Sequence, residues 1–277
     1  MPSIVINSKR RICMSIPEYL AESLQLQSPV TCEPIAGGAV NHIYSLTDRE
    51  HHYIVKWLGN DSFSGIDRAA QFAMQKQLAA HSIAPTPVWL SEDHKWWVEQ
   101  FVTGDSPNIS AIQLAGALSQ IHQLPVSAPS LDLVQRLVHY QAAGKIADTD
   151  ELAIATRRVI TALSARENTH SGLEDDTVFC HNDLSAGHIM RLSPLLIIDW
   201  EYGARANRYF DLAACASINQ LGASQCTSLV CAYAEHTHIP VERVAAEFTF
   251  YQEVVTVTEG LWTAAAKNSV KSTQAEQ

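Results

Sequence analysis

The sequence predicts an α+β fold in which a strand-rich N-terminal part precedes a larger, mainly helical C-terminal part. Runs of β-branched and aromatic residues dominate the chain before Gly104, and apolar residues at helical spacing dominate after Ser110. A group of short apolar runs interrupts the helical pattern between residues 177 and 199. With 277 residues, 47% of them hydrophobic, the chain is long enough for one large domain or for two lobes that share a cleft.

The N-terminal part is expected to combine strands with two helices. Strand-like runs occupy residues 34–46, where a glycine turn separates two strands, and residues 52–58 and 96–102. Helical spacing of apolar residues predicts helices at residues 16–26 and 67–81. Pro85 and Pro87 end the second helical pattern, because proline has no backbone N–H with which to continue it.

The C-terminal part is expected to be helical around an island of strands. Helical spacing is found at residues 112–122, 131–143 and 151–165, and again from residue 211 onward. The strand-like runs are residues 177–181, 188–192 and 195–199, with a Ser-Pro turn between the last two. The change of pattern near Gly104 predicts two lobes, residues 1–103 and residues 104–277.

Composition narrows the class of function. The formal net charge is −10, and lysines and arginines are scattered, so the basic cluster that a nucleic-acid partner needs is missing. An acidic surface favours a cationic substrate by steering, although it also simply keeps a protein in solution. The six cysteines form no CxxC pair, and no signal-peptide core or membrane-spanning apolar run is found. We therefore expect a cytoplasmic protein with free thiols and no membrane partner, whose oligomeric state no pattern predicts.

The strongest motif is His181-Asn-Asp183, followed by two isoleucines and Asp199 at the end of the last apolar run. Phosphoryl transfer needs one carboxylate to accept the proton of the substrate hydroxyl and another to hold the magnesium that bridges the phosphates. Each signal alone has an ordinary interpretation, since an isolated HxD is common and an Asp after a strand often forms a turn. The two together at this spacing favour catalysis.

This pairing resembles the catalytic and metal-binding loops of kinases. In the form HND followed by IDWEY, it is similar to the superfamily of choline kinases, thiamine kinases and aminoglycoside phosphotransferases. The resemblance implies a two-lobed protein-kinase-like fold, with a nucleotide-binding lobe at residues 1–103 and the catalytic loop and acceptor site at residues 104–277. It also implies ATP and Mg²⁺ as cofactors, with Asp183 as the catalytic base, Asp199 as the main metal ligand and His181 as a brace of the catalytic loop.

Further residues resemble the nucleotide site of this superfamily. The resemblance implies that Lys56 contacts the α- and β-phosphates and that backbone groups near Gln100 and Val102 bind adenine. Alone, a lysine on a strand is usually an exposed edge residue, and a double glycine is usually a hairpin turn. The residues that resemble the phosphate-binding glycine loop are Gly37, Gly38 and Asn41.

Two positions depart from the pattern of the superfamily. His188 stands where the second metal ligand is normally Asn, and imidazole suits Mn²⁺ better than Mg²⁺. Gln71 stands where the following helix normally supplies a glutamate partner for Lys56, and it can bond to the lysine but not pair its charge. Either catalysis persists with a changed metal preference, or Asp199 alone anchors magnesium, or the protein is a non-catalytic pseudokinase that binds a nucleotide or metabolite.

The acceptor is expected to be a small cationic alcohol of the choline, ethanolamine or thiamine type. The resemblance places Glu201, Glu259 and Trp262 near it, and aromatic faces bind quaternary nitrogen well, although Trp262 also suits a packed core. An aminoglycoside or a sugar remains an alternative acceptor. Asp211 is expected to cap a helix and tie down the catalytic loop. A metal hydrolase built on the two histidines of the motif region is disfavoured, because it leaves Lys56 without a role.

Overall fold

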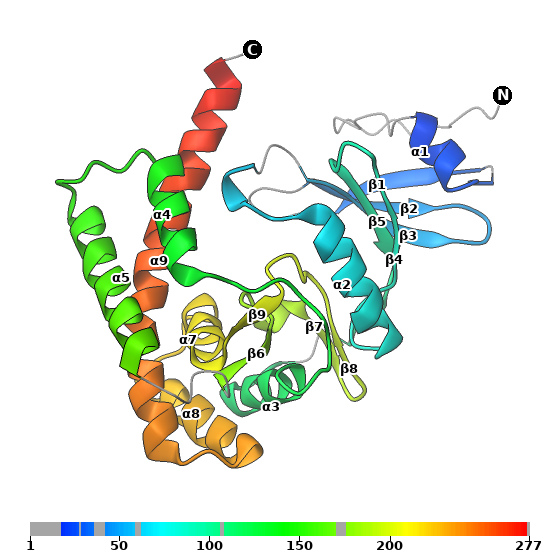
Figure 1. The fold of residues 1–277 in the computed structure, drawn as a ribbon. Helices are drawn as coiled ribbons and strands as arrows, with labels where there is room; N and C mark the ends of the chain where they lie inside the picture. The colour runs from blue at the N-terminus through cyan, green and yellow to red at the C-terminus, as the bar shows by residue number, and fades with distance from the viewer. Residues whose placement is uncertain are drawn as a thin grey trace.

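The structure, a computed structural model, describes residues 18–27, 29–35, 42–58, 62–105, 108–169 and 176–275. Figure 1 shows the N-terminal sheet and the helix α2 (Arg68–Ala80) on one side of the molecule and a larger helical part on the other side. The predicted α+β class is therefore confirmed, with an antiparallel N-terminal sheet and a helical C-terminal region. The predicted glycine-loop residues, Gly37, Gly38 and Asn41, lie outside the described residues.

The N-terminal sheet has five antiparallel strands in the order β1-β2-β3-β5-β4. Its strands are β1 (Thr31–Ile35), β2 (His42–Thr47), β3 (His52–Trp57), β4 (Pro87–Leu90) and β5 (Trp96–Gln100). Before the sheet comes α1 (Glu18–Ser23), and between β3 and β4 lie the 3₁₀ turn η1 (Ser62–Ser64) and the helix α2 (Arg68–Ala80). The side chain of Asp67 caps α2 by accepting the N–H groups of Ala69 and Ala70, which fixes the start of the predicted helix.

Both faces of the sheet are covered around β5. Trp96 and Val98 pack with Leu20 of α1 in one apolar cluster. The alternate residues of β5 face α2, where the rings of Trp97 and Phe72 meet edge to face at 5.2 Å. The continuous apolar run that predicted this strand reflects burial on both sides.

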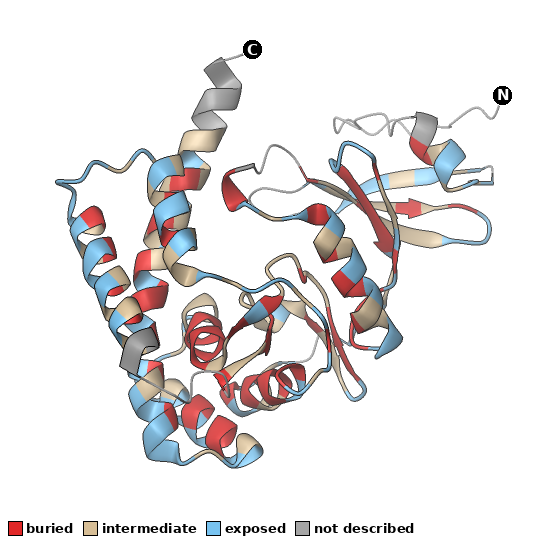
Figure 2. Cartoon of the chain, in the orientation of Figure 1, coloured by how far each residue is buried: buried red, intermediate tan, exposed pale blue. Residues whose placement is uncertain are grey.

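The helical part surrounds two small antiparallel sheets. Its helices are α3 (Ala111–Ile121), α4 (Leu133–Ala143), α5 (Glu151–Thr169), α7 (Arg208–Ile218), α8 (Ala223–Thr237) and α9 (Val241–Ala275). Strand β6 (Thr177–Cys180) pairs with β9 (Ala204–Asn207), and β7 (Ile189–Leu192) pairs with β8 (Leu195–Ile197) after the 3₁₀ turn η2 (Ala186–His188). Figure 2 shows that α3 and α7 are buried along most of their length, and their apolar residues share one core with residues of the small sheets.

The connection between the sheet and the helical part crosses β7 at close range. A Cβ on Gly104 would lie 2.9 Å from the backbone oxygen of Met190, and that oxygen accepts the N–H of Asp105. Only glycine permits this approach. The lobe boundary predicted at this residue stays a proposal. In the described part of the chain, no helix combines the length and apolar character needed to cross a membrane.

Candidate active site

The loop after β6 carries His181, Asn182 and Asp183, and the buried carboxylate of Asp211 anchors its backbone. Asp211 accepts the backbone N–H groups of His181 and Asn182 at 2.9 and 2.8 Å. Its Oδ2 also lies 3.1 Å from Nε2 of His122, so a second buried side chain orients the carboxylate. This network fixes the direction in which the loop leaves β6, because the Asp211 side chain is fully buried.

One expectation about this region is wrong. Asp211 does not cap α7, since the side chain of Asn207 accepts the N–H of Tyr209 and occupies the N-cap position. Asp211 instead stands in the first turn of α7, where its carboxylate reaches the neighbouring loop. Asn and Asp are both common N-cap residues. Asn207 takes the N-cap position because β9 ends there and α7 begins at Arg208.

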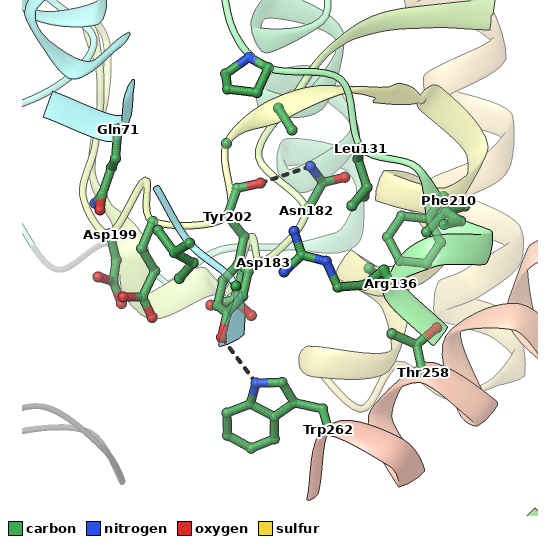
Figure 3. A pocket seen from close by; sticks show the side chains of 18 of the residues that line it. Gln71, Leu131, Arg136, Asn182, Asp183, Asp199, Tyr202, Phe210, Thr258 and Trp262 are labelled. Carbon is green, nitrogen blue, oxygen red and sulfur yellow. Dashed lines mark hydrogen bonds between the residues drawn. The ribbon is translucent and has the colours of Figure 1, made fainter. Parts of the chain in front are cut away.

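The two loops that carry the carboxylates each contain a residue in the left-handed region. Asn182 has φ +62° and Asp199 has φ +66°, a region that is uncommon for residues other than glycine and that Asn and Asp tolerate best. The side-chain amide of Asn182 donates to the backbone oxygen of Tyr202 at 2.9 Å, which ties the two loops together (Figure 3). Such backbone outliers cluster at functional sites, where the surrounding contacts compensate for their cost.

His181 forms a second link between the loops. Its Nδ1 accepts the backbone N–H of Asp183 at 3.3 Å, and its Nε2 lies 3.3 Å from the backbone oxygen of Ile198. Burial, with a smaller contribution from His188, lowers the pKa of His181 to about 4. The ring is therefore neutral near pH 7, and this is the form that accepts at one nitrogen and donates at the other.

Lys56 of β3 contacts Asp199, which is far from it in the sequence. The Nζ of Lys56 lies 3.4 Å from Oδ1 of Asp199 and 3.2 Å from Oε1 of Glu99. Burial alone would lower the pKa of Lys56, but the neighbouring carboxylates outweigh it and raise the pKa above its usual value. Burial raises the pKa of Asp199, and Lys56 and His188 outweigh it, so the carboxyl is held ionised.

Asp183, His188 and Asp199 form a group that fits a divalent cation. One ligand atom from each lies within 4.8 Å of the others. The Nδ1 of His188 lies 3.0 Å from the backbone oxygen of Asp183 and 3.5 Å from the backbone N–H of Ser185; the shorter contact is to a carbonyl, which only accepts, and favours a proton on this nitrogen. The Nε2 then directs its lone pair toward Asp199, whose Oδ2 is 3.6 Å away. Burial lowers the pKa of His188, which favours the neutral, metal-binding form.

Asp183 lies in an electrostatic environment that favours its protonated form. Burial is the largest cause, and the charges of Asp199, Glu201, Asp211 and Glu259 add to it, so the pKa rises to about 8. The carboxyl group thus holds a proton at neutral pH when no cation is present. Any positive charge placed against these carboxylates lowers that pKa.

A cavity of about 720 Å³ opens beside these groups. Figure 3 shows Asp183 and Asp199 on its wall, with Trp262 of α9 approaching the ring of Tyr202. The Nε1 of Trp262 donates to the hydroxyl of Tyr202 at 3.0 Å. The three residues predicted for the acceptor, Glu201, Glu259 and Trp262, all line this cavity together with Asp183.

Other predicted residues lie in different surroundings. Gln71 lines the cavity, but its side-chain oxygen accepts from Arg68 at 2.8 Å, and Arg68 in turn lies 3.2 Å from Oε2 of Glu201. Gln100 and Val102 are absent from the cavity wall. The N–H of Gln100 already donates to the backbone oxygen of Thr86, so an adenine contact at Gln100 would need its carbonyl.

Three residues of the site were missed by sequence reasoning. Arg136 and Tyr140 of α4 line the cavity, with the guanidinium 5.6 Å from the ring centre, and Arg136 also donates to the backbone oxygen of Ser64. Their spacing of four residues on a predicted helix places them on one face, which was the available signal. Glu99 had no such signal, because only the pairing of β3 with β5 brings it to Lys56.

Comparison with known proteins shows which family the chain matches. Residues 31–248 match the model of the phosphotransferase enzyme family. A segment of 48 residues is 48% identical to choline kinase B1 of Caenorhabditis elegans, and it covers 16% of this chain and 13% of that protein. The match thus spans only a small part of the length of that curated relative.

Solved structures share the fold. The choline kinase LicA from Streptococcus pneumoniae has a TM-score of 0.71 at 19% identity, over 91% of this chain and 90% of that chain. An ethanolamine kinase of Plasmodium vivax has a TM-score of 0.67 at 17% identity, over 89% and 79% of the two chains. A type VIII aminoglycoside-3'-phosphotransferase has a TM-score of 0.57 at 19% identity, over 82% and 93%. These likenesses confirm the predicted kinase-like fold.

Proposed function

The chain belongs to the phosphotransferase enzyme family, and from this premise we propose that it transfers the γ-phosphate of ATP to the hydroxyl of a small cationic alcohol. One observation carries the proposal: Asp183 lines a single cavity together with Lys56 and Asp199 and with Glu259 and Trp262. The groups needed to hold a nucleotide phosphate and those suited to a cationic acceptor therefore meet at one carboxylate. In this role the protein works in the cytoplasm, where ATP is supplied.

Asp183 and Lys56 take the direct roles in the transfer. Lys56 contacts the phosphates with its ammonium group, which buried carboxylates keep charged. Asp183 accepts the proton of the acceptor hydroxyl and so makes its oxygen a better nucleophile. His181 and Asp211 hold the loop that aims Asp183 and take no proton themselves.

A divalent cation fits the residues at Asp199 and His188. Their donor set is a carboxylate oxygen and a neutral imidazole nitrogen, with Asp183 nearby. A bound cation would supply positive charge that neutralises the phosphates of the nucleotide. Compensating the charge of Asp199 also removes one cause of the raised pKa of Asp183, which favours the ionised base.

The cavity supports a cationic acceptor through its charge and its rings. Its wall holds five carboxylates and two cationic side chains, so its formal charge is negative. The faces of Trp262 and Tyr202 add aromatic surface of the kind that binds an ammonium or quaternary nitrogen. Arg136 lies against the ring of Tyr140, with its guanidinium 5.6 Å from the ring centre, so this ring is already partly engaged.

The test is a turnover assay with a panel of acceptors. Purified protein receives ATP with Mg²⁺ or Mn²⁺ and, in separate reactions, choline, ethanolamine, thiamine, an aminoglycoside or a neutral sugar. We expect ATP-dependent phosphorylation of a cationic alcohol and none of the sugar. Phosphorylation of the aminoglycoside alone would move the acceptor to that class, and nucleotide binding without turnover of any acceptor would favour a non-catalytic binding protein.

Asp183→Asn tests the role of the base within this assay. The amide cannot accept the proton, so we expect kcat to fall by about 10²- to 10⁴-fold while the dissociation constant for ATP changes little. Glu253→Gln, at an exposed position on α9 paired with Arg158, serves as the matched carboxylate-to-amide control. Residual turnover of Asp183→Asn near the wild-type rate would contradict the assignment.

A further inference from the structure

Lys56 has a buried carboxylate partner on its own sheet. Its Nζ lies 3.2 Å from Oε1 of Glu99, and the two side chains are only 12% and 4% exposed. Glu99 belongs to β5, which pairs with β3 so that Glu99 faces Ile54 and Trp97 faces Lys56. Lys56 and Glu99 are therefore diagonal neighbours on one face of the sheet, within reach of long side chains.

Other contacts hold Glu99 in this orientation. Its Oε2 accepts the Nε1–H of Trp97 at 2.9 Å and the side-chain amide of Gln75 at 2.8 Å. The amide of Gln75 also donates to the backbone oxygen of Pro85 at 3.1 Å. Two neutral donors thus satisfy one carboxylate oxygen, and the other oxygen is directed at Lys56.

The helix α2 is unable to supply this charge. From Arg68 to Ala80 it contains no Asp or Glu. The side-chain oxygen Oε1 of Gln71 accepts a hydrogen bond from Arg68, and Arg68 itself pairs with Glu201. At the active site, α2 therefore contributes a cation to the loop after Asp199 and no anion to Lys56.

We propose that Glu99 is the positioning residue for Lys56: the carboxylate that holds its ammonium group in the cleft comes from β5 and not from α2. The use of that ammonium group for phosphate binding rests on the proposed function, whereas the pairing itself does not. Both residues lie in one sheet, so the pair needs no carboxylate from α2, and α2 contributes only the neutral amide of Gln75 that orients Glu99. Lys56 is thus held ready before the nucleotide arrives.

Glu99→Gln tests the proposal with the least change in shape. The amide oxygen still accepts from Trp97 and Gln75, but an NH₂ group replaces the oxygen that faces Lys56. We expect the dissociation constant for metal-bound ATP to rise about tenfold or more, with the affinity for adenosine unchanged, since adenosine offers Lys56 no phosphate. Glu99→Asp keeps the charge and should recover part of the ATP affinity.

The controls separate positioning from damage. Glu92→Gln makes the same chemical change at an exposed residue of the β4–β5 turn and should leave ATP binding unaltered. Equal loss of ATP and adenosine affinity in Glu99→Gln would show general damage and would overturn the proposal. Wild-type affinity for ATP in Glu99→Gln would overturn it as well.

A measurement without nucleotide separates this proposal from the proposed function. Denaturant unfolding of Lys56→Met, Glu99→Gln and the double variant forms a double-mutant cycle for the pair. We expect the double variant to be about as stable as Lys56→Met or more so, because Lys56→Met alone leaves the buried Glu99 carboxylate without a cation. Additive losses would overturn the pairing. Non-additive losses in a protein that binds no ATP would retain the pairing and defeat only the proposed function.

Discussion

At the scale of single residues, we propose that His188 sets which metal the site prefers. Its Nδ1 is engaged by the backbone oxygen of Asp183, and its Nε2 faces Asp199. An imidazole nitrogen oriented by a hydrogen bond at its other nitrogen is the usual arrangement of a histidine metal ligand. The hard Mg²⁺ ion prefers oxygen ligands, whereas Mn²⁺ accepts nitrogen readily.

His188→Asn is expected to reverse this preference. An amide oxygen replaces the ring nitrogen, so the ratio of kcat/KM with Mn²⁺ to kcat/KM with Mg²⁺ should fall by about tenfold or more. Initial rates with each metal give the ratio, and calorimetric titration of each metal gives its affinity without turnover. His238→Asn, at an exposed C-cap with φ +57° that asparagine tolerates, is the control. An unchanged ratio would show that His188 is not a ligand.

The sequence predicted the residues of the carboxylate loops because those residues are nearly contiguous. His181 and Asp183 are two positions apart, and a single hairpin leads from them to Asp199. The partner of Lys56 was not predictable in this way. Glu99 comes close to Lys56 only because of the register in which β3 pairs with β5. That register depends on which residues of both strands are buried, so neither strand predicts it alone.

At the scale of elements, the turn between β2 and β3 supports the strand that carries Lys56. Asp48 follows β2, and its carboxylate accepts the backbone N–H groups of Gln27, Glu50 and His51. Burial would raise the pKa of Asp48, but these hydrogen bonds outweigh it and lower the pKa from 3.8 to about 2. The ionised carboxylate therefore ties the hairpin to the segment after α1.

The stabilisation by Asp48 should depend on pH. Because the folded-state pKa is depressed, the contribution is fully present above the unfolded-state value and is lost as the pH falls toward 2. Asp48→Asn should reduce the free energy of unfolding by about 1–3 kcal/mol at pH 7, and the difference from wild type should shrink between about pH 4 and pH 2. Urea unfolding at several pH values measures it, with Glu50→Gln in the same turn as control. A difference that does not change over this range would contradict the argument.

Two strands escaped prediction for a physical reason. β4 (Pro87–Leu90) begins at the second of the prolines that end the helical pattern, and β9 (Ala204–Asn207) has no run of β-branched residues. Each is only four residues long; β4 pairs with the next strand, β5, and β9 pairs with the more distant β6. Short strands of this kind depend on tertiary partners more than on their own propensity.

At the scale of the whole molecule, the cavity that we propose for the acceptor is assembled from segments far apart in the sequence. The loop after β6 contributes Asp183, the loop after β8 contributes Glu201, and α9 contributes Glu259 and Trp262. The segment before α2 closes one side, where Phe63 meets Trp262 edge to face at 6.0 Å. No local pattern encodes such a cavity, so the sequence indicated its residues only through the resemblance to known kinases.

Because the nucleotide groups and the acceptor groups come from different segments, their effects should be separable. Glu259 lines the cavity from α9, whereas Lys56 is supplied by β3. Glu259→Gln removes one negative charge from the acceptor side. We expect KM for a cationic alcohol to rise by about two- to fivefold, with kcat and the affinity for ATP nearly unchanged, since a solvent-exposed charge contributes about 1 kcal/mol or less.

Ionic strength provides the discriminating measurement. The loss in Glu259→Gln should shrink as salt is raised from about 0.05 to 0.5 M, because salt screens the attraction that the wild-type carboxylate exerts on the acceptor. Glu253→Gln lies on the same helix but pairs with Arg158 on the surface, so its KM should follow wild type at every salt concentration. A neutral acceptor that suffers the same loss as the cationic one would show that Glu259 acts through shape and not through charge, and the cationic class of the acceptor would then lose its support.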